Sequence, residues 1–239
     1  MVPSHTYITQ RRLLFVMMMQ FAIPALSLMA SKPVTNSYDL VVIGGGSAGL
    51  TAAKFSRTFG KSVVIIEKER MGGDCTWTGC IPSKSLLASA KAAQAVRKAA
   101  DFGVEIEGKV TVNMKTVAQR LKRNIQHIYE EDDSPEAMQA LGIDVISGSA
   151  SFLEPKCIEV TGTDGERKSV YANDGVLIAT GARPKLPLDS IEGLESIHYM
   201  TYEEIFGLEE VPAKVTVVVR FITAATIFLC LFTLTCTVY

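Results

Sequence analysis

The segment GGDCTWTGCIPSK, residues 72–84, contains the two side chains with the most distinctive chemistry in this sequence, Cys75 and Cys80. Two cysteines this close can form a structural disulfide, supply half of a zinc site, or exchange electrons as a redox-active disulfide. A zinc site needs two more ligands, but no histidine lies nearby and no other cysteine sits in a stretch that looks built around it, which argues against zinc. A structural disulfide remains open if the domain is exported, but it leaves the following residues 81–84 unexplained.

The residues after Cys80 favour the redox interpretation. Pro82 suits the first turn of a helix, so Cys80 is predicted at the N-terminus of a helix that continues through SLLASA. The partial positive charge of a helix N-terminus and the ammonium group of Lys84 both stabilise a thiolate. A stabilised thiolate is what disulfide exchange with a substrate requires.

A second chemical signature lies earlier in the chain, in DLVVIGGGSAGL. A buried parallel strand leads into Gly44, Gly46 and Gly49, a helix follows to about Phe59, and a second strand ends at Glu67. Gly44 permits the tight turn, Gly46 lets the backbone approach a pyrophosphate, and Gly49 lets the helix pack on the strand. Glu67 lies 18 residues after Gly49, near the spacing of an acid that binds ribose hydroxyls. Together these residues predict a dinucleotide site.

The rest of the middle region supplies elements that position these two segments. Residues 85–100 are rich in helix formers, and residues 112–131 form a second predicted helix, in which His127 is expected to have a surface or packing role and not a catalytic one. The apolar positions of that second helix, at helical spacing, are Val117, Leu121, Ile125 and Ile128. After Gly142 the pattern changes to short strands, in which Cys157 is predicted to be a small buried hydrophobic residue.

Composition excludes some classes of function. A formal net charge of -1 gives no basic excess, so we predict no nucleic-acid partner. Five scattered cysteines in 239 residues are too few for a disulfide-framework fold.

The N-terminal segment differs from the middle of the chain, because its first acidic residue is Asp39. Arg11 and Arg12 precede an apolar run, residues 13–30, which predicts a signal peptide or other targeting segment at residues 1–30. An organelle transit peptide and an ordinary buried helix are the alternatives. Residues 31–36 are the predicted linker. The expected location is therefore the secretory pathway or an organelle.

The C-terminal residues 219–239 form an apolar tail without a charged residue after Arg220. Its length approaches that of a transmembrane helix, so membrane association is one interpretation. Threonines and β-branched residues weaken the helix prediction. Lys214 and Arg220 also flank the tail on the side that the positive-inside tendency disfavours, if residues 1–30 translocate the middle region. The alternative is a truncated chain whose tail has no function.

The order GGGSAG, Glu67, GGDCTWTGCIPSK and ATGARP resembles the FAD-binding N-terminal half of the class I pyridine nucleotide-disulfide oxidoreductases. That family includes dihydrolipoyl dehydrogenase, mercuric reductase and glutathione reductase. The resemblance covers about residues 37–218, and CIPSK is closer to the first two branches than to the third. Asp74 and Trp77 depart from the threonine and asparagine that are usual there, which is similar to a mercuric reductase-like branch. The implied fold is an α/β, Rossmann-like FAD-binding domain with three layers and an antiparallel β insertion in a parallel sheet.

The resemblance also implies roles for individual residues. Cys75 would be the interchange thiol that attacks a disulfide substrate, and Cys80 the charge-transfer thiol against the flavin. Lys84 would lie near the flavin ring, and Ala150 would contact the adenine end by its backbone. The residues implied to bind FAD are Gly44, Gly46, Ser47, Ala48, Gly49, Glu67, Lys68, Gly73, Asp74, Lys84, Ala150, Thr180 and Gly181.

The implied reaction passes electrons between NAD(P)H, FAD and a Cys75–Cys80 disulfide, with a small disulfide, dithiol or mercuric ion as substrate. Residues 211–218 resemble the first strand of an NAD(P) domain, but the sequence continues into the apolar tail without a second GxGxxG. The family's homodimerisation domain is absent as well. An alternative is therefore a catalytically incomplete flavin-binding fragment, with or without a membrane tether. A small thiol oxidase that uses oxygen directly is a more remote alternative.

Overall fold

The computed structural model describes residues 36–186, 191–210, 212, 214 and 216–218. The predicted targeting segment, residues 1–30, and the apolar tail, residues 219–239, lie outside the described residues, as does nearly all of the predicted linker. Among the helices that are described, none has the length and hydropathy needed to cross a membrane. The targeting segment and the membrane association therefore stay predictions.

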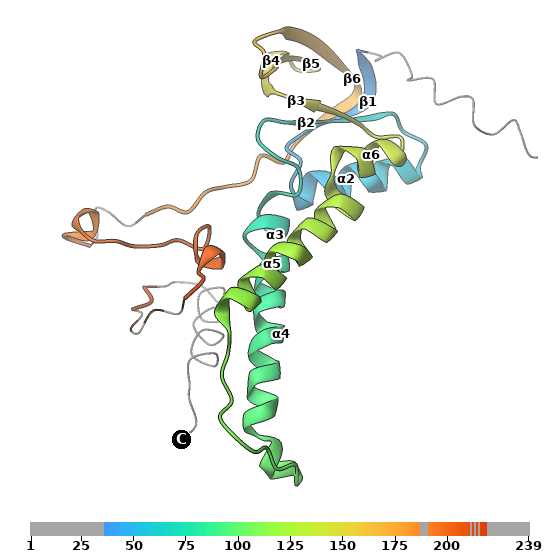
Figure 1. Ribbon diagram of the computed structural model, residues 1–239. Helices are drawn as coiled ribbons and strands as arrows, with labels where there is room; N and C mark the ends of the chain where they lie inside the picture. Colours follow the sequence, from blue (N-terminus) through green and yellow to red (C-terminus); the bar gives the residue numbers. More distant parts are fainter. Residues whose placement is uncertain (1–35, 187–190, 211, 213, 215, 219–239) are drawn as a thin grey trace, which may run out of the picture. The chain divides into compact units, whose positions relative to one another are not determined.

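Within the described residues, six strands form one mixed sheet in the order β3-β2-β1-β6-β5-β4 (Figure 1). The strands β3, β2, β1 and β6 run parallel, and β5 and β4 continue the sheet in antiparallel pairs. Their bounds are β1 Ser37–Ile43, β2 Val63–Glu67, β3 Asp144–Ser147, β4 Ser149–Glu154, β5 Cys157–Thr161 and β6 Arg167–Ile178. A parallel sheet that carries an antiparallel insertion confirms the predicted fold class.

Strand β6 joins the two parts of the sheet because it is long enough to pair twice. Its first residues, as far as Tyr171, pair antiparallel with β5, and Tyr171 lies opposite Cys157. From Tyr171 onward the same strand pairs parallel with β1, where Tyr171 lies opposite Ser37. The strand therefore ends at Ile178 beside Ile43, so that the segments following both strands leave the sheet together.

Helices connect and cover the strands. Their bounds are α2 Ser47–Thr58, α3 Gly73–Trp77, α4 Cys80–Arg97, α5 Met114–Ile128 and α6 Pro135–Ala140. Short turns of 3₁₀-helix are η1 Ala99–Phe102, η3 Leu194–Ser196 and η4 Ile205–Gly207, and η2 Tyr129–Asp133 is a turn of π-helix.

Side-chain caps mark where two of these helices begin. The Asn113 side chain accepts a hydrogen bond from the Thr116 N–H at the start of α5. Ser134 caps α6 in the same way through the Ala137 N–H, and Pro135 occupies the first position of that helix. The π-turn η2 fills the short space between these two helices.

Alternate residues of the parallel strands point to opposite faces of the sheet and build two cores. On one face, Tyr38, Val41, Val64 and Ile66 pack against Ile158 and other residues of β5 and β6. On the other face, Val42, Val63 and Ile65 pack with Leu50 and Ala53 of α2 and with Met138 and Ile143 near α6. The parallel strands thus have helical residues on one face and residues of β5 and β6 on the other.

A third cluster joins α4 to α5, which lie side by side (Figure 1). Leu86 and Ala90 of α4 pack against Leu121 of α5 and Phe206 of η4, with Val117 at the edge. The predicted apolar face of α5 is therefore confirmed at Leu121, while Ile125 and Ile128 are half-buried.

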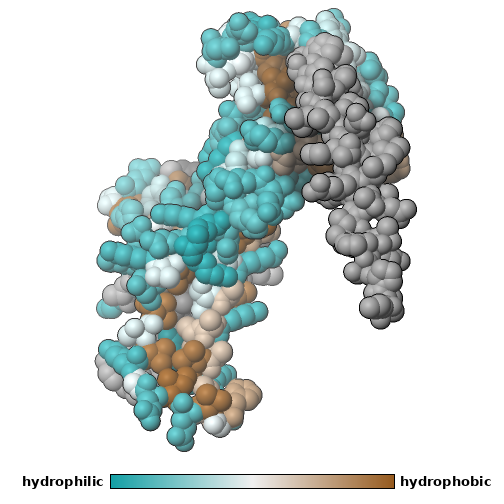
Figure 2. All heavy atoms as spheres, turned by 45° about the vertical axis from the view of Figure 1, so that its right-hand side comes forward, coloured by the Kyte–Doolittle hydropathy of each residue, from teal (hydrophilic) through white to brown (hydrophobic). Residues whose placement is uncertain are grey.

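Two minor predictions are also confirmed. Cys157 is buried, and His127 lies on the surface of α5 with its imidazole 3.4 Å from the Glu131 carboxylate. Figure 2 shows a largely hydrophilic surface with hydrophobic side chains at the bottom of the view, where α4 ends. Exposed apolar residues of that region are Val96, Phe102, Val104, Ile106 and Val110.

Candidate functional site

A cavity of about 870 Å³ opens where the parallel strands end. Ile43 of β1, Glu67 of β2 and Ala179, just after β6, all line it. In the sheet, β1 lies between β2 and β6, so the chain continues from β1 to one side of it and later returns to the other side. The cavity therefore lies at the point where the strand order reverses. In open α/β sheets this is the place where ligands bind.

The Gly-rich turn after β1 lacks side chains because its surroundings leave no room for them. Gly44 has φ +110°, a conformation that favours glycine, and its N–H donates to the Ile66 carbonyl at 2.8 Å. A Cβ at Gly49 would collide with the Gly44 carbonyl oxygen and would lie 3.1 Å from Val42 Cγ1. The predicted roles of Gly44 in the turn and of Gly49 in helix–strand packing are therefore confirmed.

The N-terminus of α2 faces this cavity through Ser47 and Ala48. No side chain caps the helix at Gly46, and no acidic residue lies in its first turn. The first N–H groups of the helix therefore keep their hydrogen-bonding capacity and its partial positive charge is not neutralised. Such a helix end binds a phosphate or pyrophosphate well.

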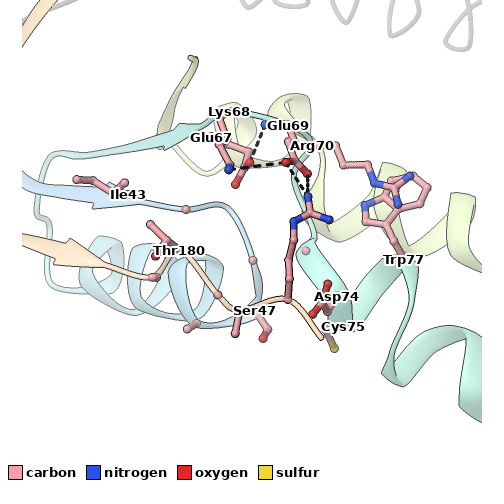
Figure 3. Close-up of a pocket in the computed structure, with 18 of the residues that line it drawn as sticks. Ile43, Ser47, Glu67, Lys68, Glu69, Arg70, Asp74, Cys75, Trp77 and Thr180 are labelled. Carbon is pink, nitrogen blue, oxygen red and sulfur yellow. Dashed lines mark hydrogen bonds and ion pairs between the residues drawn. The ribbon is translucent and has the colours of Figure 1, made fainter. Parts of the chain in front are cut away.

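Glu67 ties the end of β2 to the Gly-rich turn. Its carboxylate accepts hydrogen bonds from the Gly45 N–H at 2.6 Å and from the Glu69 N–H at 2.8 Å. The same side chain lines the cavity, where Figure 3 shows it beside Lys68. The acid predicted to bind ribose hydroxyls thus has a second task, since it also orders the backbone of the turn.

The two cysteines meet at the junction of α3 and α4. Cys75 lies in α3, is half-buried and lines the cavity, whereas Cys80 is the first residue of α4 and is exposed. Burial raises the pKa of the Cys75 thiol, and a hydrogen bond with the Cys80 thiol raises it further. Both thiols are free in the structure.

The start of α4 matches the prediction made for it. Cys80 is its first residue, Pro82 lies in its first turn, and no acidic residue is present there. The preceding Gly79 offers no side-chain cap. Lys84 is exposed one turn after Cys80, so the two residues share a face of the helix. Cys80 thus lies at the positive end of the helix dipole.

Several contacts hold the cysteine loop, residues 72–80, against the rest of the domain. The Thr76 hydroxyl, 2% exposed, donates to the carboxylate of Asp133. The Trp77 indole N–H donates to the Met71 carbonyl at 2.8 Å, and the Arg70 guanidinium stacks over the indole at 3.9 Å (Figure 3). The indole also contacts the ring of Tyr129, with 5.1 Å between the ring centroids.

A later segment of the chain contacts the rim of the cavity. The Tyr202 hydroxyl donates to the Asp74 carboxylate at 3.0 Å. Burial and this hydrogen bond raise the pKa of Tyr202 to about 12, so the phenol stays protonated at physiological pH. Arg183 donates to both carboxylate oxygens of Glu69, at 2.9 and 3.0 Å, and lies 3.6 Å from Glu203.

Most of the residues predicted to form the site are brought together. Those that line the cavity are Gly44, Gly46, Ser47, Ala48, Glu67, Lys68, Gly73, Asp74, Cys75, Ala150, Thr180 and Gly181. Gly49, Cys80 and Lys84 lie outside the lining. Gly49 acts beneath the turn, and Cys80 reaches the cavity through its contact with Cys75.

Among the lining residues to which the sequence assigned no site role, five carry a charge or an aromatic ring, and these are Glu69, Arg70, Trp77, Arg183 and Glu203. Trp77 and Arg183 belong to the motifs GGDCTWTGC and ATGARP, and that position is a signal that could have identified them. Glu203 comes from a stretch without a motif. Only the path of residues 191–210 brings it to the rim.

Comparison with known proteins agrees with this geometry. The family profile described as "Pyridine nucleotide-disulphide oxidoreductase" matches residues 38–219. The chain is 33% identical over 192 residues to a dihydrolipoyl dehydrogenase of Bacillus subtilis (strain 168), covering 77% of this chain and 40% of the relative.

Two further relatives carry different names. Over 185 residues the chain is 31% identical to a glutathione reductase of Nostoc sp., covering 77% of this chain and 38% of that protein. Over 187 residues it is 33% identical to a mercuric reductase of Streptomyces lividans, covering 73% of this chain and 36% of that protein. The chain thus spans about 40% of the length of the curated relatives it matches.

Proposed function

Because the chain belongs to the pyridine nucleotide-disulphide oxidoreductase family, we propose that it provides the FAD-binding domain of a disulfide oxidoreductase whose redox-active pair is Cys75 and Cys80. FAD is the cofactor of this family, and NAD(P)H is the partner nucleotide. One observation carries the proposal: Cys75 lines the same cavity as the Gly-rich turn and contacts the thiol of Cys80. A dinucleotide bound there would lie against a dithiol.

The cavity fits FAD in size and in the chemistry of its walls. Its volume of about 870 Å³ lies within the roughly 300–1,000 Å³ of small-molecule sites. Gly46 and the uncapped start of α2 suit the pyrophosphate, because backbone N–H groups point at it and no Cβ intervenes. Glu67 suits the ribose hydroxyls, and Ala150, Thr180 and Gly181 line the same cavity.

The two thiols are suited to different steps of disulfide exchange. The Cys75 thiolate attacks one sulfur of a disulfide substrate, forms a mixed disulfide and releases the first substrate thiolate, which takes up a proton. The Cys80 thiolate then attacks the Cys75 sulfur, releases the second substrate thiolate and closes the Cys75–Cys80 disulfide. Bound flavin supplies the electrons that reopen this disulfide.

The substrate is proposed only by class. The relatives are named as dihydrolipoyl dehydrogenase, glutathione reductase and mercuric reductase, so a small disulfide or dithiol, or mercuric ion, is the candidate. The exposed position of Cys80 and the half-buried position of Cys75 suit a small substrate, because a short approach reaches both sulfurs. Use of NAD(P)H and assembly as a homodimer belong to the same proposal.

The visible absorption spectrum of the purified 239-residue chain, saturated with FAD and freed of excess ligand, tests the proposal. We expect a retained flavin spectrum and, after mild dithiol reduction, a long-wavelength band from the Cys80 thiolate near the flavin. Cys80→Ser should abolish the band and keep the flavin, whereas Cys75→Ser should keep both. A chain that folds but retains no flavin would contradict the proposal.

A second reading of the same sample separates an oxidoreductase domain from a passive flavin-binding fragment. Full oxidation followed by thiol titration should show a Cys75–Cys80 disulfide that dithiol reopens. Retained flavin with two thiols that never pair would support the catalytically incomplete fragment instead.

A further inference from the structure

Asp133 lies behind the redox pair, in a position that the proposed function does not use. It ends the π-turn η2, 58 residues after Cys75 in the sequence, and its side chain is 14% exposed. A carboxylate this well buried is rare unless it is paired. Turns of π-helix are rare and are frequent at functional sites.

Two groups contact this carboxylate, and a third feels its charge. The buried Thr76 hydroxyl donates to it, and Thr76 is the residue directly after Cys75 in α3. Lys54 of α2 places its Nζ 4.0 Å from Asp133 Oδ1 and donates to the Asp132 carbonyl at 2.8 Å. The third group is Cys75 itself, whose thiol feels the negative charge of Asp133 after the larger influences of burial and Cys80.

We propose that Asp133 is a positioning residue that fixes Cys75 through Thr76 and keeps the proton of the reduced pair on Cys75. The proposal rests on the proposed redox role of Cys75 and Cys80. Reduction of their disulfide by two electrons and one proton leaves one thiol and one thiolate. A negative charge beside Cys75 and a helix N-terminus at Cys80 both direct the proton to Cys75.

The arrangement separates the tasks of two otherwise similar sulfurs. Cys80, at the start of α4, attacks the mixed disulfide, and Cys75 loses its proton only when a substrate is in place. Cys80 contacts Cys75, and Lys54 lies beside Asp133. The other charged groups on the cavity wall are Glu67, Lys68, Glu69, Arg70, Asp74, Arg183 and Glu203. Of all these groups, Lys54 opposes Asp133 directly, so the two residues should act on Cys75 in opposite directions.

The pH dependence of cysteine alkylation in the full chain tests the proposal. The reduced protein is treated with iodoacetamide between pH 5 and pH 10, and tryptic peptide 71–84, which contains both cysteines, is fragmented to measure each site separately. Asp133→Asn keeps an oxygen that can accept from Thr76 but removes the charge. The midpoint of Cys75 alkylation should fall by about 0.5 to 1 pH unit, and its rate at pH 7.5 should rise about threefold to tenfold.

Matched variants distinguish an effect of the Asp133 charge from a general loosening of the cysteine loop. Asp132→Asn removes the same charge from the neighbouring exposed residue and should leave the midpoint unchanged. Thr76→Val removes the hydrogen bond but keeps the charge, so the midpoint should stay at or above that of the unsubstituted chain. Lys54→Gln should raise the midpoint, and it tests the proposal even if Asp133→Asn does not fold.

Two results would overturn the inference. One is an unchanged Cys75 midpoint in a folded Asp133→Asn chain, and the other is an equal fall in Asp133→Asn and Thr76→Val. Failure of the proposed function looks different, because there the unsubstituted chain would not form a Cys75–Cys80 disulfide on treatment with oxidised dithiothreitol.

Discussion

The Gly-rich turn, residues 44–49, and the cysteine loop, residues 72–80, line the same cavity but are held in place differently. The turn is shaped by its own backbone, since Gly44 and Gly49 fit only because they have no side chain, and a single acid, Glu67, accepts from its Gly45 N–H. The loop is fixed by side chains from distant residues, with Thr76 bound to Asp133 and Asp74 bound to Tyr202. A binding site for a common cofactor can thus be local, while a pair of thiols with unequal roles needs partners from elsewhere in the fold.

The largest effect is expected from a substitution that disrupts the Gly-rich turn. Gly49→Val places a branched side chain against the Gly44 carbonyl and Val42, which strand and helix cannot both avoid. We expect the free energy of unfolding to fall by about 3 kcal/mol or more. Gly175→Ala is the control, because a Cβ at Gly175 meets nothing within 4 Å. Chemical denaturation of both variants measures the difference, and a Gly49→Val chain as stable as the control would refute the packing argument.

The next effect concerns the cysteine loop. Thr76→Val keeps the shape of the side chain but leaves the buried Asp133 carboxylate without its hydroxyl donor. We expect the free energy of unfolding to fall by about 1 to 3 kcal/mol. Thr78→Val is the matched control, since the Thr78 hydroxyl makes only a long contact of 3.5 Å with Asp74. Equal stability of the two variants would show that the loop does not depend on its distant partner.

Glu67→Gln sharpens the comparison because Glu67 serves both the turn and the ligand. The amide oxygen can still accept from the Gly45 N–H, but the charged acceptor for ribose hydroxyls is lost. We expect FAD affinity to fall about fivefold, equivalent to about 1 kcal/mol, as measured by quenching of flavin fluorescence. Glu69→Gln, which alters a carboxylate bound to Arg183, should leave affinity nearly unchanged. The ribose assignment fails if the two variants bind FAD equally.

The smallest effect is expected at the rim. Arg183→Gln removes ion pairs with Glu69 and Glu203, and Arg183 and Glu69 are both exposed. We expect the free energy of unfolding to change by less than about 0.5 kcal/mol, because water and salt already screen such pairs. Thermal unfolding at low and high salt measures it. A large loss of stability that salt does not change would mean that these ion pairs are better shielded from water than their exposure indicates.

The sequence by itself was sufficient to predict the fold class and most of the cavity. Strand alternation, the glycines at 44, 46 and 49, the acid at 67 and the helix start at Cys80 depend on near neighbours in the chain, and local sterics and hydrogen bonding decide them. Contacts of that kind leave a pattern that can be read from residue types and spacing.

The tertiary structure alone decided which distant groups reach the site. No periodicity links Thr76 to Asp133 or Asp74 to Tyr202, residues that lie 57 and 128 positions apart. Their meeting depends on how η2 and residues 191–210 are placed by the packing of α4, α5 and the sheet. It also decided that Cys75, and not Cys80, lines the cavity, because the short helix α3 turns the first cysteine inward while the start of α4 leaves the second exposed.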